Sequence, residues 1–434
     1  MLSSGPFPPA NCAPAIRSSD DKYIDLRCEF CNIRLVKSAQ FALSINGFTA
    51  SIQVSSQEFR ACFIYFERLR LEQKVVSFLD TLLGRKHPPV IGLDISSSSV
   101  KLVELGQDAS GEFVLERFAA ETFEKGWITD GQIEKFDEVA AAVKRVVLKS
   151  GTRTKYVVMA MPQSAVITKK IMLPAGLRDD ELELQVETEA NQYIPFSLDE
   201  VSLDFCVIGP SPASAGDVEV LIAASRKDRV QDRQGLAEAA GLKPMVLDIE
   251  SHASRLAMSR VIAALPNGGK DALVALFEIG ADTTSLKVLR DDEMLYDRDQ
   301  AFGGSQLTQL ISRQYGFSFE EAEQKKLSAD LPDDYDTAIL NPFVDSLSQE
   351  IGRALQYFFT STPHHKVHYV MLSGGTATLA GLKDRVTELT GFASMVVNPF
   401  DNMKLGGAVR ESKLRREASS YLTACGLAMR RFAQ

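Results

Sequence analysis

Serine, aspartate and lysine are concentrated in one short segment, Asp94-Ile-Ser-Ser-Ser-Ser-Val-Lys101. A tight turn between strands presents backbone N–H groups to a phosphate, and small residues let the phosphate approach closely. The hydroxyls of Ser96, Ser97, Ser98 and Ser99 would add donors. Asp94 could hold a Mg²⁺ ion through water, and Lys101 could balance phosphate charge. A plain Ser-rich hairpin would contain the same residues, so this turn alone is weak support for a phosphate site.

A second polar turn, Glu278-Ile-Gly-Ala-Asp-Thr-Thr284, follows another apolar run. Gly280 permits a close approach of the backbone, and the polar tip is supplied by Asp282, Thr283 and Thr284. Taken alone, this segment too could be only a turn. Its position supports a second phosphate hairpin, because it follows the first strand of a second copy of the same pattern.

Two glycine pairs complete the set of loops. Gly374 and Gly375 end a buried strand, and Thr376 lies near the start of the helix that follows. Such a loop puts flat backbone beside a base or sugar and N–H groups at a helix start. Gly303 and Gly304 begin another helix in a similar way.

The elements that must position these loops form two copies of one pattern. Strand, turn and strand are predicted for Val90–Leu105, a further strand for Phe113–Thr122, a helix for Ile133–Leu148 and a buried strand for Tyr156–Met161. The pattern recurs in the strands Ala272–Ile279, Thr284–Leu289 and Glu293–Asp299. Helical segments at Gly304–Leu327 and Val344–Phe359 and a strand at Lys366–Leu372 follow. Two copies of an α/β unit predict two lobes.

A different unit interrupts the first copy. The order of elements from Ile167 to Ile249 is strand, acidic helix, two strands, helix and strand, with a Pro- and Ser-rich loop between the two central strands. This β-α-β-β-α-β string predicts a small inserted subdomain. The predicted boundaries are 76–163 for the first lobe, 164–245 for the insert and 246–269 for the return to the first lobe. The second lobe takes 270–302 and 366–434, with a helical subdomain at 303–365.

In order and spacing, the loops resemble those of the actin, Hsp70 and hexokinase superfamily. Its signatures are one phosphate hairpin per lobe and a Gly-Gly adenosine motif. The segment from Ala322 to Lys326 resembles a helix of bacterial actins whose glutamate and lysine reach the ribose, which here implies Glu323 and Lys326. The resemblance implies an actin-like, ribonuclease H-like duplicated ATPase fold that binds ATP and Mg²⁺. A solvated helix face is the alternative reading of Glu323 and Lys326.

Within that superfamily, residues 76–434 resemble the PilM family of type IV pilus assembly adaptors. The segment ETEANQYIPFSLDE at 187–200 is the most family-specific motif. The resemblance implies that the cytoplasmic tail of the membrane protein PilN lies in a groove between the insert and the first lobe. PilO and the motor ATPases would then be within reach, on the cytoplasmic face of the inner membrane. We expect Tyr193–Phe196 to lie in the core of the insert rather than in that groove, and homo-oligomerisation stays open.

Two departures from the superfamily pattern concern the hairpins. Ser96 stands where glycine is usual, and Glu278 stands where most relatives have aspartate, which leaves a carboxylate on a longer arm. No convincing water-activating residue is evident, and Gln163 is the best candidate by position. We therefore expect ATP binding to act as a latch between conformations, with at most slow hydrolysis. The alternatives are a filament-forming protein like FtsA and, from another class, a small-molecule kinase of the same fold.

Composition and charge exclude several other classes of function. The formal net charge of −9 argues against general affinity for nucleic acid or anionic lipid. The sequence contains no apolar run of the ~18 to 20 residues that a membrane helix needs. Cys28 and Cys31 have zinc-like spacing, but no second pair follows at a useful distance, so a metal site is not predicted.

The segment before Val75 reads differently from the rest of the chain. It is rich in Pro, Ser and Cys and has weak periodicity, whereas a short amphipathic helix and a basic turn follow from Val75. We expect residues 1–75 to come from an over-extended reading frame or to be disordered, with translation starting near Val75 or Val76. The alternative is an appendage that docks on a partner.

Overall fold

The computed structural model describes residues 23–28, 31–36, 40–45, 48–53, 88–211, 214–291 and 293–432. The chain divides into two compact units, Met1–Lys86 and His87–Gln434. In the first unit the strands β1 (Tyr23–Cys28), β2 (Cys31–Val36), β3 (Gln40–Ile45) and β4 (Phe48–Gln53) pair antiparallel in chain order. The weak periodicity of this segment did not predict that sheet. The helix expected from Val75 lies outside the described residues, and the start of translation stays a prediction.

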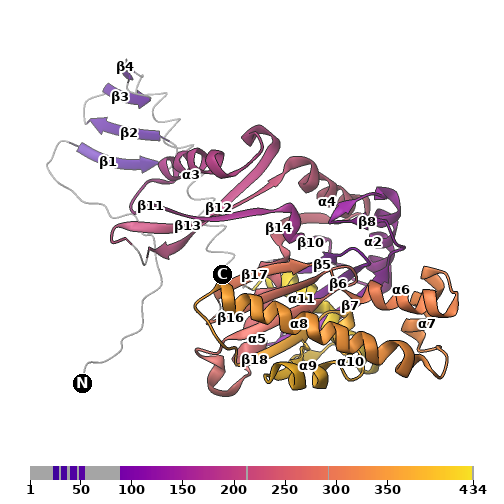
Figure 1. The fold of residues 1–434 in the computed structure, drawn as a ribbon. Helices are drawn as coiled ribbons and strands as arrows, with labels where there is room; N and C mark the ends of the chain where they lie inside the picture. The colour runs from indigo at the N-terminus through magenta and orange to yellow at the C-terminus, as the bar shows by residue number, and fades with distance from the viewer. Residues whose placement is uncertain are drawn as a thin grey trace. The chain divides into compact units, whose positions relative to one another are not determined.

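The first lobe is built on a six-stranded sheet in the order β14-β10-β5-β6-β7-β20, of which Figure 1 labels all strands but the last. Its strands are β5 (Val90–Ile95), β6 (Ser99–Gln107), β7 (Phe113–Thr122), β10 (Tyr156–Met161), β14 (Lys243–Ile249) and β20 (Lys404–Leu405). Every residue of β5 is buried, as its apolar run predicts for a central strand. The β5–β6 pair is antiparallel, whereas β10 runs parallel to β5.

Helix α2 (Phe136–Ser150) covers one face of this sheet because its apolar residues recur at helical spacing. Val139, Val143 and Val146 are fully buried, and the helix ends at Gly151 in the left-handed conformation. The short hairpin of β8 (Ile128–Thr129) and β9 (Gln132–Ile133) precedes it. These elements share one core with β5, β6 and β10.

The insert has its own three-stranded antiparallel sheet, in the order β11-β13-β12. The strands are β11 (Ile167–Pro174), β12 (Val201–Pro210) and β13 (Asp217–Arg226), and α3 (Asp179–Tyr193) packs its buried Val186 and Ala190 into their core. All six elements of the predicted β-α-β-β-α-β string are present, but the last two do not belong to the insert. Helix α4 (Lys227–Ala239) buries Leu236 in the first-lobe core, and β14 pairs with β10, because both follow the last insert strand back to the first lobe.

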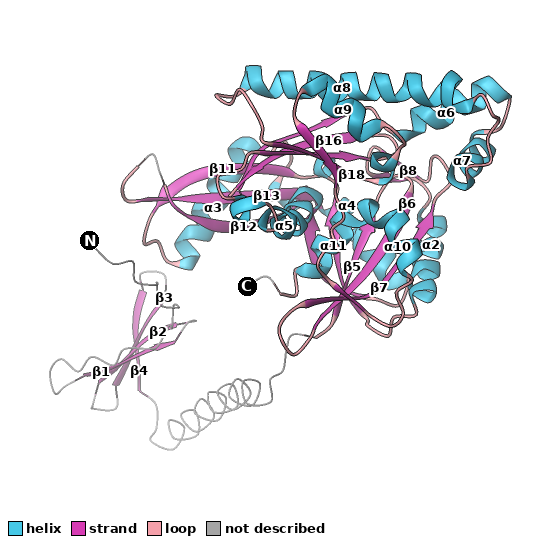
Figure 2. Ribbon diagram, turned by 90° about the horizontal axis from the view of Figure 1, so that it is seen from below, coloured by secondary structure: helices cyan, strands magenta, loops and turns pink. Residues whose placement is uncertain are grey.

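The second lobe is built on a five-stranded sheet in the order β17-β16-β15-β18-β19. These strands are β15 (Val274–Ile279), β16 (Thr284–Arg290), β17 (Glu293–Gln300), β18 (Tyr369–Ser373) and β19 (Ala393–Val396). Helices α6 (Gly304–Tyr315), α8 (Asn341–Ser361) and α9 (Leu382–Thr390) lie on one side of it (Figure 2). The segment Gly304–Leu327 is not one helix, because Gly316 in the left-handed conformation ends α6 before α7 (Phe319–Ser328) begins.

The C-terminal segment returns to the first lobe. After α10 (Glu411–Glu417) and the short helix η6 (Ala418–Tyr421), α11 (Leu422–Met429) packs on β5 and on α5 (Glu250–Ala263), as its yellow ribbon shows (Figure 1). Glycines make this packing close: a Cβ on Gly426 would lie 1.7 Å from the carbonyl oxygen of Ala253. Among the described residues, no helix combines the length and apolarity that a membrane crossing requires.

Candidate functional site

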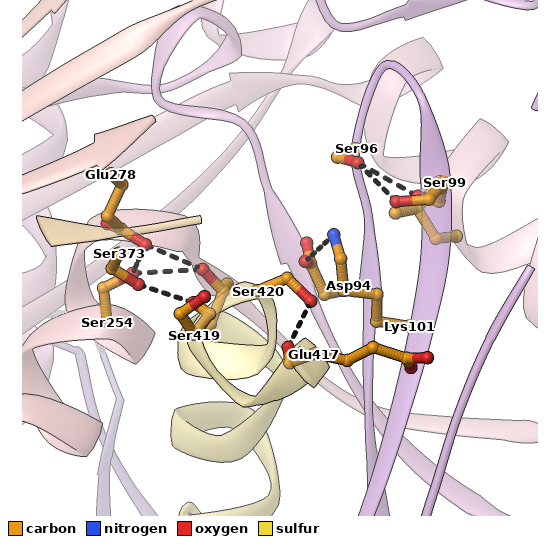
Figure 3. A network of polar contacts seen from close by, with 12 residues as sticks. Asp94, Ser96, Ser99, Lys101, Ser254, Glu278, Ser373, Glu417, Ser419 and Ser420 are labelled. Atoms are coloured by element: carbon orange, nitrogen blue, oxygen red, sulfur yellow. Dashed lines mark hydrogen bonds and ion pairs between the residues drawn. The ribbon is translucent and has the colours of Figure 1, made fainter. Parts of the chain in front are cut away.

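The first hairpin is a compact turn at the end of β5 (Figure 3). The backbone N–H of Ser96 donates to the carbonyl oxygen of Ser99 across 2.9 Å, the Ser96 hydroxyl donates to the same oxygen across 3.1 Å, and the hydroxyl oxygens of Ser96 and Ser99 lie 3.3 Å apart. Ser97 and Ser98 form the tip between them. The turn therefore has the small side chains that a phosphate would require.

Asp94 and Lys101 face each other across this hairpin. They are opposite residues of the β5–β6 ladder, and Lys101 Nζ lies 3.6 Å from a carboxylate oxygen of Asp94. Burial raises the pKa of Asp94, the nearby charge of Glu278 raises it further, and Lys101 acts in the opposite direction. Lys101 was expected to balance phosphate charge, and in this structure its nearest charge is Asp94.

The second hairpin holds its carboxylate away from the turn. Gly280 N–H donates to the carbonyl oxygen of Thr283 across 2.9 Å, while Asp282 and Thr283 are exposed at the tip. The Thr284 hydroxyl is used internally, donating to the carbonyl oxygen of Phe302 across 2.7 Å. Only the tip of this hairpin is free to meet a ligand.

Glu278 is held by three side chains. Its carboxylate forms an ion pair with the buried Lys287 on β16 and accepts hydrogen bonds from Ser254 on α5 and Thr423 on α11, at 3.0 and 3.3 Å. The prediction that the longer arm would change the geometry at a metal is not tested. What the longer arm does here is reach both helices that link the lobes.

The two glycine pairs pack against the second hairpin, backbone to backbone. Gly374 has φ +96°, and a Cβ there would lie 2.3 Å from the carbonyl oxygen of Ile279. A Cβ on Gly303 would meet the carbonyl oxygen of Ala281 at the same distance. Gly304 N–H and the Thr376 hydroxyl both donate to the carbonyl oxygen of Gly280, at 3.0 and 3.2 Å. Three loops that are distant in sequence thus form one surface of closely packed backbone.

Glu323 and Lys326 converge on one hydroxyl of the neighbouring helix. Thr308 on α6 donates to the Glu323 carboxylate, and Lys326 Nζ donates to Thr308 Oγ1 across 2.7 Å. Lys326 also lies 2.6 Å from the Glu323 carboxylate. The pair therefore fixes α7 on α6, and the half-exposed Glu323 stays accessible.

Sequence reasoning missed Glu250, the first residue of α5. Burial raises the pKa of Glu250 to about 7, the charges of Asp94 and Glu278 raise it, and Arg233 and Lys287 act in the opposite direction. A carboxyl with such a pKa exchanges a proton near neutral pH, as a general base must. The signal that could have identified Glu250 in the sequence is its position, since it is an acidic residue directly after the apolar strand of the VLDIE segment, where a helix begins.

Gln163, the water-activating candidate taken from the sequence, lies in the short helix η1 (Gln163–Ala165) that begins the insert. Its side-chain oxygen accepts a hydrogen bond from the Ser251 hydroxyl across 2.9 Å. Because Ser251 follows Glu250 directly, Gln163 lies close to the missed carboxylate, and its role stays a prediction.

The aromatic residues of the family-specific motif lie at the surface of the insert. Tyr193 is 46% exposed and Phe196 is 37% exposed, whereas Ile194 is buried. The prediction that this cluster forms core is therefore wrong for the two rings and right for Ile194. Lys169 lies over the ring of Tyr193 and Arg226 over that of Phe196. The two rings therefore pack against cationic side chains at the surface and not against the apolar core of the insert.

No group of three or more acidic, His or Cys side chains in the described part of the chain is arranged to hold a metal ion. Asp94 is accordingly not part of a preformed metal cage. The side chains of Cys28 and Cys31 lie outside the description.

Comparisons with known proteins agree on the kind of chain this is. A family model for type IV pilus assembly protein PilM matches residues 92–432. The solved structure of a PilM-PilN type IV pilus biogenesis complex is 29% identical with a TM-score of 0.66, and the match covers 80% of this chain and 99% of that one.

More distant solved structures are similar over most of their length. Ethanolamine utilization protein EutJ from Carboxydothermus hydrogenoformans is 16% identical with a TM-score of 0.47, covering 79% of this chain and 89% of that one. MreB5 of Spiroplasma citri bound to ADP is 11% identical with a TM-score of 0.41, covering 80% and 100%. The predicted fold class is confirmed by the match to the PilM structure.

Proposed function

Because this chain belongs to the family of type IV pilus assembly protein PilM, we propose that it is an ATP-binding adaptor that docks the cytoplasmic tail of PilN. It would work on the cytoplasmic face of the inner membrane and bring the complex of PilN and PilO within reach of the motor ATPases. The observation that carries the nucleotide part is the packing of the second hairpin against both glycine pairs.

ATP fits the residues of this site. A Cβ at Gly303 or Gly374 would collide with the backbone of the second hairpin, so only glycine lets these loops pack closely against it. The backbone N–H groups of the first hairpin and of the exposed tip of the second, at Asp282 and Thr283, would receive the phosphates. Glu323 and Lys326, already converging on Thr308, would meet the ribose.

Magnesium would be held mainly by the phosphates and by water. The described residues bring no cluster of metal ligands together, and Asp94 is the acidic group on the first hairpin that could bind the hydration shell. Mg²⁺ characteristically keeps several waters and uses one or two carboxylates with substrate phosphates, so a site with few protein ligands suits it. The ion would neutralise phosphate charge in a site that is rich in carboxylates.

We infer that binding, more than turnover, is the function of the nucleotide. Glu250 can hold or release a proton near pH 7, which is the requirement for activating a water. The Ser251 hydroxyl donates its proton to the Gln163 side-chain oxygen, so in this arrangement that proton and that lone pair are held by each other rather than by a water. ATP would therefore favour one arrangement of the lobes and be hydrolysed slowly.

The insert and the adjoining edge of the first sheet supply apolar surface for an extended peptide. Exposed side chains on the insert include those of Tyr193, Phe196, Val207 and Ile208, and β14 exposes Met245. Strands β12 and β14 are edge strands of their sheets. A tail can dock by adding to such an edge and placing alternate side chains on apolar surface.

Calorimetric titration of the full chain with a synthetic peptide of the PilN tail, with and without Mg-ATP, tests the proposal. Micromolar or tighter binding is expected. Phe196→Ala should weaken that binding about tenfold, whereas Leu148→Ala, an exposed residue of α2, should not change it.

Three other outcomes would count against parts of the proposal. Absence of peptide binding by protein that still binds ATP would favour an FtsA-like filament protein, which sedimentation with ATP would reveal. Phosphorylation of a sugar would instead indicate a kinase. Steady ATP hydrolysis at enzyme-like rates would contradict the latch.

A further inference from the structure

Arg233 is a buried cation on α4 whose two hydrogen-bond partners are backbone carbonyls. Its side chain is almost inaccessible, the residue being 2% exposed. Nη1 donates to the carbonyl oxygen of Ile95, the last residue of β5, across 2.8 Å. Nη2 reaches the carbonyl oxygen of Gly131, in the turn between β8 and β9, across 3.4 Å. The side chain thus joins α4 to the strand end where the first hairpin turns.

The electrostatic surroundings of Arg233 are those of the candidate site. Burial lowers its pKa, and the charges of Glu250 and Asp94 act in the opposite direction. Arginine stays protonated in proteins, so a positive charge lies beside these two carboxyl groups. The charge of Arg233 in turn lowers the pKa of Glu250. Its position therefore affects both the backbone of the hairpin and the protonation of the neighbouring acid.

The helix that carries Arg233 begins at the insert. Helix α4 follows β13 directly, and Lys227 at its start donates to the carbonyl oxygen of Asp199 across 2.7 Å. The preceding residue, Arg226, lies over the ring of Phe196. One end of α4 therefore contacts the family-specific motif of the insert, and the middle of the same helix contacts the first hairpin.

We propose that Arg233 is a positioning residue that fixes the position of the first hairpin relative to α4. Through this contact it would couple the surface of the insert to the nucleotide site. The coupling rests on the proposed function, whereas the positioning does not. A movement at Phe196 or Asp199 would displace the start of α4, and the guanidinium would transmit it to Ile95. In the reverse direction, a phosphate seated on the hairpin would stabilise one position of α4.

The chemistry of arginine suits this role better than that of lysine. A planar guanidinium can donate to two carbonyls in different directions and is less strongly hydrated than an ammonium group, so it is less costly to bury. Lysine at this position would keep the charge but could not reproduce the fork. Arg233→Lys is therefore the informative variant, because it separates positioning from charge.

The same helix offers a matched control. Arg229 is also on α4 and is partly exposed, and its guanidinium donates to the side-chain oxygen of Gln132 on β9 across 2.8 Å rather than to the end of β5. Arg229→Met removes one positive charge and one arginine contact to the same β8–β9 region. It should leave the first hairpin unaffected.

The first experiment is hydrogen exchange in full-length protein without nucleotide, followed over residues 94–101. Arg233→Lys should accelerate amide exchange in this segment about tenfold, as expected for the loss of a charge-assisted hydrogen bond, while Arg229→Met should match the wild type. Unchanged exchange in Arg233→Lys would overturn the positioning role. Because no ligand is present, this result is independent of whether the protein binds ATP.

The second experiment measures coupling by titrating ATP with and without the PilN tail peptide. In the wild type each ligand should change the affinity for the other by the same factor. In Arg233→Lys that factor should fall toward one, with both ligands still binding. A factor equal to that of the wild type would overturn the coupling, whereas a wild type that binds no ATP would overturn the proposed function and leave the exchange result standing.

A pH profile distinguishes this role from a purely structural one. Besides Arg233, the charged groups that act on Glu250 include Asp94, Glu278 and Lys287. ATP affinity measured against pH should show a midpoint where Glu250 ionises. In Arg233→Met this midpoint should move to higher pH, because a positive charge beside Glu250 is lost. In Arg229→Met the midpoint should stay. If Arg233→Met does not fold, the lysine variant still decides the exchange and coupling tests.

Discussion

The carboxylate of Glu278 lies 3.0 Å from the hydroxyl of Ser254, which joins the second hairpin to the helix α5 that leaves the first-lobe sheet. The same carboxylate oxygen accepts from Thr423 on α11. An aspartate has one methylene fewer and, from the same backbone position, would extend less far toward these two helices. The glutamate therefore connects three elements whose relative positions define how the lobes meet.

The ion pair between Lys287 and Glu278 should be a large contributor to stability. Lys287 is 4% exposed, and removal of one partner of a buried pair leaves the other charge without compensation. We expect Lys287→Met to lower the free energy of unfolding by about 3 kcal/mol, measured by urea denaturation. Lys383→Met, which breaks an exposed pair with Asp384, should cost less than about 1 kcal/mol. Equal effects of the two substitutions would contradict this account.

The adjacent glycines Gly374 and Gly375, which follow β18, should respond differently to alanine. Gly374→Ala places a Cβ 2.3 Å from the carbonyl oxygen of Ile279 at a residue with φ +96°, and should cost at least about 2 kcal/mol of unfolding free energy. Gly375→Ala meets nothing within 4 Å and should change that energy by less than about 0.5 kcal/mol. Comparable losses would mean that the loop is not held in the described conformation.

Glu250 should make stability depend on pH. Its pKa rises from 4.5 to about 7 on folding, so the folded state binds the extra proton between these values. The free energy of unfolding should therefore fall as pH rises through this window, with Glu250 contributing up to about 3 kcal/mol. The contribution is fully present below pH 4.5 and lost above pH 7.

The comparison of Glu250→Gln with the wild type at pH 5 and pH 8 isolates this contribution. Burial also raises the pKa of Asp94, Asp297 and Asp299, so the wild-type slope has several sources. The variant should lose less stability than the wild type between the two pH values, whereas Glu238→Gln, at an exposed site on α4, should follow the wild type. Parallel curves for Glu250→Gln and wild type would show that Glu250 is ionised normally.

The contact between α11 and α5 should be intolerant of a methyl group. A Cβ on Gly426 would lie 1.7 Å from the carbonyl oxygen of Ala253, so Gly426→Ala must separate the two helices. We expect a loss of about 3 kcal/mol in unfolding free energy, and Gly407→Ala, with open space around it, should lose less than about 0.5 kcal/mol. A stable Gly426→Ala protein would show that the helices can move apart at little cost.

Sequence patterns were sufficient for the fold class and for the positions of both hairpins. Buried apolar runs ending in small polar residues located both hairpins, and the resemblance to the PilM family is confirmed by the family match. The glycine pairs were recognised because two adjacent residues without side chains indicate a loop where backbone must approach closely. These features are local, so the sequence around each one is enough to predict it.

What could not be predicted depends on contacts between distant segments. Glu250 is a single acidic residue in sequence, and only folding places it near Asp94 and Arg233. The fate of Glu278 depends on Ser254 and Thr423, which approach it from two helices. The helices α6 and α7 were predicted as one because Gly316 inside a periodic pattern does not by itself reveal a left-handed conformation.

The glycines where α11 packs have a consequence for how the chain is made. Gly92 on β5 has no room for a Cβ because the backbone of Ala424 and Ala428 covers it. Strand β5 precedes α11 in the chain, with the insert and the second lobe between them, so it is synthesised well before the helix that covers it. The first lobe therefore cannot complete its core until α11 has been synthesised, and a product that lacks α11 would expose apolar surface to aggregation.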